Sequence, residues 1–182
     1  MAMQTGREIE RRWLIAPEAL PAEIYNLAPD RIRQGYLTPR GWMPTVRVRI
    51  IERGKRQFAF QTIKSVPVAE ADAEGLDELE FGLAPNVAHA MMRVAPAKLR
   101  KDRFVQPITG KLLKWEFDVF KEALDGLIIA EIEVPSLATP IEVPAYFGPE
   151  ITGLRSLSNV MLAYEPEQAL AEARSLLRGL SG

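Results

Sequence analysis

The chain has 182 residues, no cysteine and a formal net charge of −1 at pH 7. This length fits one domain, and a hydrophobic content of 47% is enough to build a core. The balanced charge provides no general basic field for nucleic acid, and the lack of cysteine excludes disulfides, thiolate metal sites and a cysteine nucleophile. No signal-peptide core or bilayer-spanning apolar run is present, so we expect a cytoplasmic protein with no membrane or nucleic-acid partner.

The first predicted strand is Glu8–Ile15. Side chains alternate along a strand, so Glu8, Glu10 and Arg12 share one face and Trp13 points to the other. The segment after this strand contains two prolines, and a short helix is predicted there, over about 17–27. Further alternating strands are predicted, in chain order, over 31–37, 45–51, 57–65, 76–81, 97–105, 112–120 and 127–134.

Helical spacing predicts helices over 86–94, 154–163 and 165–180, and the last of these is clearly amphipathic. Residues 136–149 hold three prolines and a glycine and are predicted to be an irregular connection. No composition change marks a boundary. We therefore expect a single α+β domain over residues 1–182, including the C-terminal helix at about 165–180.

One charge pattern recurs on nearly every predicted strand: charged residues stand two apart, with apolar residues on the opposite face. The carboxylate pairs are Glu8/Glu10, Glu78/Glu80, Glu116/Asp118 and Glu131/Glu133. The cations are Arg12, Arg47/Arg49, Lys64 and Lys101/Arg103. A solvated sheet face explains any single pair. The repetition of like-charged pairs demands counter-ions, because adjacent like charges repel.

A closed antiparallel β-barrel satisfies this demand by holding the charges inside and covering its apolar outer face with helices. Facing carboxylates form a hard oxygen site suited to Mg²⁺ or Mn²⁺. Inward Arg and Lys side chains form a cradle for a polyanion, since the Arg fork matches phosphate oxygens. These groups suit metal-assisted phosphoryl transfer to water, which depends on charge neutralisation and positioning.

The ordered motifs resemble those of the CYTH family, the triphosphate tunnel metalloenzymes. The family's ExExK strand reads Glu8-Ile9-Glu10-Arg11-Arg12 here. The resemblance continues through Gln34–Leu37, Val46–Arg49, Thr62–Ser65, Glu78–Glu80, Lys101–Phe104, Trp115–Phe120, Ala130–Glu133, Phe147–Thr152 and Ser158-Asn159. It covers roughly residues 7–163. It implies an eight-stranded antiparallel β-barrel, a triphosphate tunnel, with flanking helices and a C-terminal helix.

The resemblance also implies roles for the charged residues. Mg²⁺ or Mn²⁺ would be held by Glu8, Glu10, Glu131 and Glu133. The phosphates would be held by Arg12, Arg47, Arg49, Lys64, Lys101 and Arg103, with Arg155 as a displaced cation. Glu116 and Asp118 match the central acidic pair that places the metal or the attacking water. The predicted catalytic residues are Arg12, Lys101, Glu116 and Asp118.

Three departures from the family pattern affect the phosphate cradle. Arg12 replaces the hallmark lysine, Leu76 stands where an arginine is usual, and Ser156 lies where a basic residue is usual. Each lost inward cation removes a charge-assisted contact of about 1.5–3 kcal/mol. We therefore expect reduced substrate affinity, a reshaped pocket or partial loss of activity.

The leading hypothesis is metal-dependent hydrolysis of a triphosphate, with inorganic tripolyphosphate as the first substrate to test. The alternatives are a class IV-type adenylate cyclase, a tunnel that binds polyphosphate or nucleotides without turnover, and a barrel whose charges pair only with one another. Trp42 lies in a loop and is the better tryptophan for stacking on an organic group, whereas His89 is expected to be structural. The C-terminal helix is expected to brace or cover the barrel; the other reading is a homodimer contact.

Overall fold

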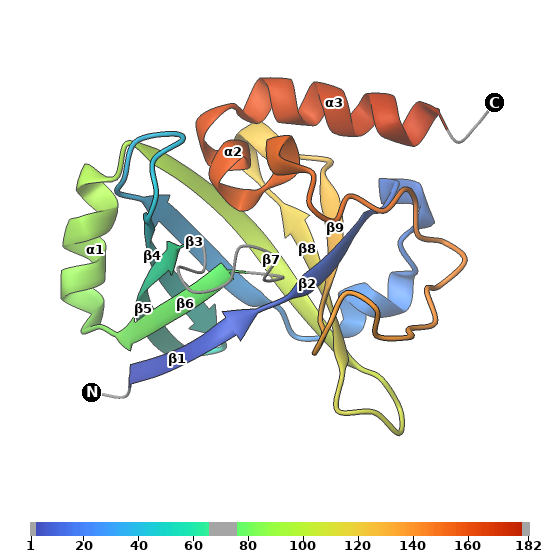
Figure 1. Cartoon of the computed structure of the whole chain (residues 1–182), viewed down its shortest axis with the longest axis horizontal. Coiled ribbons are helices and arrows are strands. Elements are labelled where there is room, and N and C mark those ends of the chain that lie inside the picture. Colours follow the sequence, from blue (N-terminus) through green and yellow to red (C-terminus); the bar gives the residue numbers. More distant parts are fainter. Residues whose placement is uncertain (1–2, 66–75, 180–182) are drawn as a thin grey trace.

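The computed structural model describes residues 3–65 and 76–179; the side chains of residues 3–8 and of Leu76 lie outside this description. The described residues form one nine-stranded antiparallel sheet in the order β1-β6-β5-β4-β3-β7-β8-β9-β2 (Figure 1). Its strands are β1 (Met3–Glu8), β2 (Glu10–Leu14), β3 (Asp30–Tyr36), β4 (Thr45–Arg53), β5 (Arg56–Ser65), β6 (Leu76–Gly82), β7 (Ala97–Pro107), β8 (Lys114–Phe120) and β9 (Ile128–Glu133).

The predicted N-terminal strand is divided in two, so the sheet has nine strands where eight were expected, and no strand pairing among the described residues closes it into a barrel. The ladder breaks at Ile9, so β1 pairs with β6 while β2 pairs with β9. These two strands are the opposite edges of the sheet and do not pair with each other. Only one residue separates them, and in Figure 1 they follow one another across the open side of the sheet.

The predicted helices all have helical counterparts; the one predicted over 86–94 begins one residue earlier, and the others are shorter or divided. Pro17 and Pro21 interrupt the first predicted helix, because proline has no N–H to donate, and two 3₁₀ turns form there, η1 (Pro17–Ala19) and η2 (Ala22–Asn26). The helix predicted over 154–163 is divided into η4 (Arg155–Leu157) and α2 (Asn159–Tyr164). The other helical elements are α1 (Pro85–Val94), η3 (Glu122–Leu124) and α3 (Pro166–Arg178). No described helix has the length and apolar character to cross a membrane.

The helices and the irregular segment cover the apolar face of the sheet. Helix α1 packs on β4 and β5 through a cluster that includes Val48, Ile50 and Ala88. Helices α2 and α3 cover a second cluster, and a third contains Trp13 and Trp115. The two indole rings meet edge to face at a centroid distance of 5.5 Å, as expected for strand residues that point away from the charged face. The opposite face of the sheet is thereby left to the charged side chains.

Candidate functional site

The charged face of the sheet borders two adjoining cavities, which we call the inner and outer chambers. Both chambers are lined by Glu10, Arg47, Lys64 and Asn159. The inner chamber, of about 70 Å³, is further lined by Gln34, Arg49, Lys101, Arg103, Glu116, Glu131 and Glu133. The outer chamber, of about 290 Å³, is further lined by Ile9, Arg12, Tyr36, Thr45, Leu137, Thr152, Gly153, Ser158 and Val160. The structure thus brings most of the predicted phosphate-binding cations to one continuous site.

Cross-strand register supplies the counter-ions that the like-charged pairs require. Arg12 lies opposite Glu131, and its Nε donates to the Glu131 Oε1 at 3.0 Å. Lys64 lies opposite Glu78, with 3.0 Å between the Lys64 Nζ and a Glu78 carboxylate oxygen. At these two positions a charge on one strand faces a charge of the opposite sign on its neighbour, which offsets the repulsion along each strand.

Arg103 is the centre of the inner chamber. Its Nε and Nη2 each donate to a different oxygen of Asp118 at 2.6 Å, its Nη2 also donates to Glu131 at 2.5 Å, and its Nη1 donates to Glu116. Burial alone would lower the pKa of Arg103, but Asp118 and Glu131 outweigh this effect and hold the pKa well above its ordinary value. One guanidinium thus donates hydrogen bonds to three carboxylates at the core of the site.

Lys101 completes this network from the same strand. It is 3% exposed and donates to Asp118, which is fully buried. Burial and the neighbouring Arg103 lower the pKa of Lys101. Burial also opposes the ionisation of Glu131, yet Lys101, Arg103 and Arg12 together hold its pKa well below the usual range. The inner chamber is therefore a tightly paired network rather than a set of separate charges.

The cations on β4 are less completely paired. Arg47 donates from its Nη2 to the Thr62 hydroxyl at 3.1 Å, and Arg49 donates to Glu80 at 2.8 Å. The buried Nε atoms of both arginines have no hydrogen-bond partner among the described residues. Burial and the nearby Arg47 lower the pKa of Arg49. Such buried donors favour an anionic ligand, because each unmade hydrogen bond costs free energy.

The wall of the outer chamber carries neutral polar groups as well as cations. Tyr36 accepts a hydrogen bond of 2.5 Å from Gln34, and burial raises its pKa to about 12. The Thr152 hydroxyl accepts the Arg12 N–H at 3.0 Å. Sequence reasoning did not propose Ser158 for the site; its only signal was the Ser-Asn step of the family pattern. Its Oγ is buried at this wall.

The carboxylates suit a hard divalent cation chemically. Glu10 lies opposite Glu133 in the β2–β9 ladder, and Glu116 lies opposite Glu131 in the β8–β9 ladder. Oxygen donors of this kind are the ligands that Mg²⁺ and Mn²⁺ prefer. Within residues 3–65 and 76–179, no three Asp, Glu, His or Cys side chains converge as a ready-made metal site. The Glu8 side chain, the fourth predicted ligand, lies outside the described residues.

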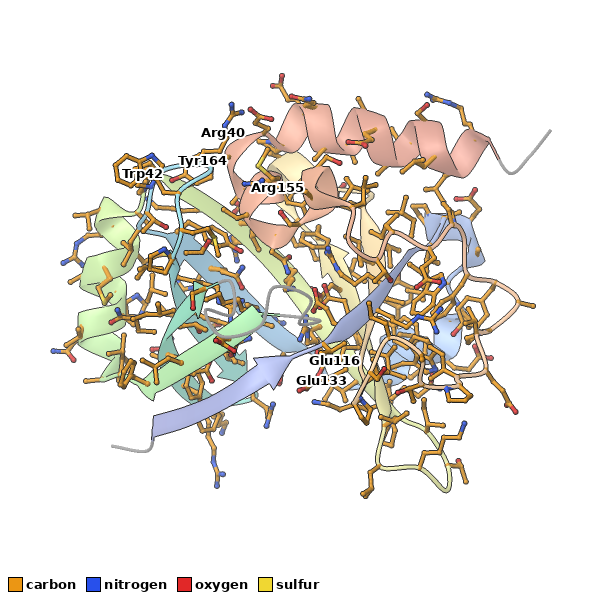
Figure 2. All side chains as sticks on the ribbon, in the orientation of Figure 1. Arg40, Trp42, Glu116, Glu133, Arg155 and Tyr164 are labelled. Atoms are coloured by element: carbon orange, nitrogen blue, oxygen red, sulfur yellow. The ribbon has the colours of Figure 1, made fainter. Side chains whose placement is uncertain are left out.

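Arg155 is not brought to either chamber. It is exposed and borders a separate surface hollow with Arg40 and Glu165. Figure 2 shows Arg155 beside α2, away from Glu116 and Glu133. This placement does not support the phosphate-binding role expected for Arg155. The neighbouring Ser156 also points away, since its Oγ donates to Glu172 of α3 at 3.0 Å.

The tryptophan proposed for stacking, Trp42, and the histidine expected to be structural, His89, both lie outside the chambers. Trp42 is 67% exposed in the loop between β3 and β4 and lines neither chamber. His89 lies on α1, where its Nε2 is 3.3 Å from the Gln57 Oε1. Neither residue contacts the charged cluster described above.

Comparison with known proteins identifies relatives over nearly the whole chain. No family model matches the sequence. An inorganic triphosphatase from Acetivibrio thermocellus is 26% identical over 167 residues, which cover 92% of this chain and 99% of the relative.

Solved structures show the same likeness. The crystal structure of the inorganic triphosphatase NE1496 matches with a TM-score of 0.59 and 27% identity, covering 87% of this chain and 95% of that one. A second structure of NE1496, described as a hypothetical protein, matches with a TM-score of 0.59 and 28% identity over 86% of this chain and 97% of that one. Over nearly its whole length the chain is therefore similar to inorganic triphosphatases, in agreement with the ordered charge motifs.

Proposed function

We propose that this chain hydrolyses a triphosphate, with inorganic tripolyphosphate as the preferred substrate. The observation that carries the proposal is the gathering of Arg12, Arg47, Lys64 and Arg103 around two adjoining cavities beside a set of carboxylates. The relatives named as inorganic triphosphatases support it. In this reaction, water attacks the terminal phosphorus, the bridging P–O bond breaks, and orthophosphate and pyrophosphate leave.

The tunnel is closed, in this proposal, by the N-terminal segment of a single domain. Strand β1 extends one edge of the sheet and β2 extends the other, with only Ile9 between them. The two edges are therefore held together by one continuous piece of chain, which supports a barrel rather than an open sheet. A substrate in this tunnel would be surrounded by side chains from several strands and shielded from bulk water.

The cations bind and orient the phosphates. Arg12 and Arg47 are at most 8% exposed, and each keeps a buried nitrogen without a partner among the described residues. Charge-assisted hydrogen bonds from such donors are the strongest available to a phosphate oxygen. Lys101 and Arg103 would help to neutralise the charge that develops as the P–O bond breaks.

The carboxylates would hold the metal and the attacking water. Glu8, Glu10, Glu131 and Glu133 would hold Mg²⁺ or Mn²⁺; Glu131 and Glu133 stand two residues apart on β9, and Glu10 lies opposite Glu133. When bound, such a cation neutralises phosphate charge and polarises water. Glu116 lines the inner chamber and would accept a hydrogen bond from the attacking water, whereas the fully buried Asp118, which lines neither chamber, would hold Lys101 and Arg103 in position. The hydroxide character of that water is then stabilised where it attacks.

The test is a metal-resolved substrate screen. Purified protein is incubated with tripolyphosphate, ATP, thiamine triphosphate or pyrophosphate in Mg²⁺ or Mn²⁺, and every product is followed. We expect orthophosphate from tripolyphosphate, and no product after chelation with EDTA. Absence of orthophosphate from every triphosphate would refute the hydrolase proposal. Cyclic AMP and pyrophosphate from ATP would instead identify a cyclase, and tight binding without products a binding protein.

A further inference from the structure

Ser158 occupies the N-cap position of α2 without performing the usual capping role. A serine at this position commonly accepts a hydrogen bond from an N–H of the first helical turn. In this chain the Ser158 side chain makes no cap hydrogen bond. Its backbone carbonyl accepts from the Leu162 N–H at 2.9 Å, so the helix is anchored by the backbone alone. The hydroxyl is therefore available for another partner.

The other polar side chains on this wall are already engaged. Thr152 accepts from the Arg12 N–H at 3.0 Å and donates to Glu150 at 2.7 Å. The Asn159 Oδ1 lies 3.5 Å from the Lys101 Nζ. The Ser158 Oγ, in contrast, is buried and has no hydrogen-bond partner in the described part of the chain. A native buried hydroxyl of this kind is uncommon and points to a ligand.

Two cationic donors with the same property border the same chamber. The Arg12 Nη2 and the Arg47 Nε are buried without hydrogen-bond partners among the described residues, and both side chains line the outer chamber with Ser158. Arg12 is 5% exposed and Arg47 is 8% exposed, so bulk water does not solvate these atoms well. The three groups come from β2, β4 and the segment before α2, and no single element places them together.

We propose that Ser158 is a further substrate-binding residue, whose hydroxyl donates to a phosphate oxygen held by Arg12 and Arg47 in the outer chamber. This inference rests on the proposed triphosphate hydrolysis. A phosphate group suits the three donors because it offers several acceptor oxygens and negative charge at once. The subsite replaces, from within the chamber, the contact that the sequence pattern assigned to Arg155.

The experiment compares Ser158→Thr with Ser158→Val, two nearly isosteric side chains that differ in the hydroxyl. Ser156→Ala is the matched control, because Ser156 bonds to Glu172 outside both chambers. Tripolyphosphate binding is measured by calorimetry in EDTA, where the metal-dependent reaction cannot proceed. Steady-state kinetics with Mn²⁺ and the melting temperature are measured in parallel.

We expect Ser158→Val to weaken tripolyphosphate binding about tenfold, or about 1.4 kcal/mol, and to raise KM similarly. We expect Ser158→Thr to stay within about threefold of the wild type and Ser156→Ala to bind as the wild type does. Equal affinity of Ser158→Val and the wild type would overturn this inference alone. Equal losses in Ser158→Thr and Ser158→Val would also overturn it, since the hydroxyl would then not matter. A wild type that neither binds nor hydrolyses any triphosphate would overturn the proposed function as well.

Discussion

Arg103 and the arginines Arg12, Arg47 and Arg49 all lie on the charged face of the sheet, yet they differ in how completely their hydrogen-bond donors are paired. In the inner chamber, Arg103 contacts Glu116, Asp118 and Glu131, so its donors are satisfied within the protein. In contrast, Arg12 of the outer chamber, Arg47 of both chambers and Arg49 of the inner chamber retain buried nitrogens with no hydrogen-bond partner among the described residues. The carboxylates that lie across the strands decide which cations remain available to a ligand.

This difference suggests that the fully paired and the incompletely paired arginines have different roles, one structural and the other in ligand binding. A paired network is rigid and holds the carboxylates in place, because every member is fixed by several hydrogen bonds. Incompletely paired donors instead gain most from an incoming phosphate. We therefore expect substitutions in the network around Arg103 to affect stability most, and substitutions of the incompletely paired arginines to affect substrate affinity most. Four variants test this expectation.

The largest effect is expected for Arg103→Gln. Removing the guanidinium leaves the buried Asp118 and Glu131 without their main counter-ion, and breaking such a buried network typically costs about 3–5 kcal/mol. Urea unfolding measures the change. The matched control is Arg100→Gln on the same strand, whose pair with Glu122 is exposed and should contribute less than about 1 kcal/mol. Similar losses in the two variants would contradict the central role of Arg103.

The next largest effect is expected for Arg12→Gln, which removes a cation from the outer chamber. We expect tripolyphosphate affinity to fall about 10- to 100-fold, since a charge-assisted hydrogen bond contributes about 1.5–3 kcal/mol. Calorimetry on the folded variant measures the affinity. Arg11→Gln is the control, because Arg11 points to the other face and pairs with Glu150 at 2.7 Å. An equal loss in both variants would show that general charge, rather than chamber position, sets the affinity.

A smaller effect, on the pH dependence of stability, is expected for Glu131→Gln. Burial opposes ionisation of Glu131, but Lys101, Arg103 and Arg12 hold its folded-state pKa below the unfolded value of about 4.3. Its contribution is therefore complete above that value and is lost as the pH falls through the folded pKa. The free energy of unfolding should fall less steeply below about pH 4 in the variant than in the wild type. Parallel pH profiles from urea unfolding would disprove this linkage.

The smallest effect is expected for Arg155→Gln. The side chain is exposed and lines neither chamber, and surface charges are largely screened at physiological salt. Tripolyphosphate affinity should change by less than about twofold, which calorimetry can detect. A tenfold loss of tripolyphosphate affinity would show that Arg155 binds phosphate, and it would weaken the proposal that Ser158 does so.

Strand alternation allowed the shared face of the charged residues to be predicted. A period of two places Arg47 and Arg49 on one side of β4 and Val48 and Ile50 on the other, and the structure buries the two apolar residues under α1. The same rule correctly placed Trp13 and Trp115 on the covered face. These features depend on local geometry, which the order of residues fixes directly.

The break at Ile9 could not be predicted in this way. Glu8–Ile15 alternates without interruption in the sequence, so it was interpreted as one strand. In the structure, β1 and β2 have different neighbours, β6 and β9, and the backbone changes ladders between them. The division results from the curvature of a sheet whose two edges must be reached by one segment. The alternation of side chains along one segment does not show which neighbouring strands that segment pairs with.

By itself, the sequence determined the fold class, the charged face and the family motifs, because each follows from residue spacing along the chain. Only the tertiary structure decided which carboxylate faces which cation, since that depends on the register between strands. It also decided that Ser158, rather than Arg155, lies at the chamber wall. Residues 136–158 include irregular segments without a fixed period, so the direction of their side chains is set by packing against the sheet.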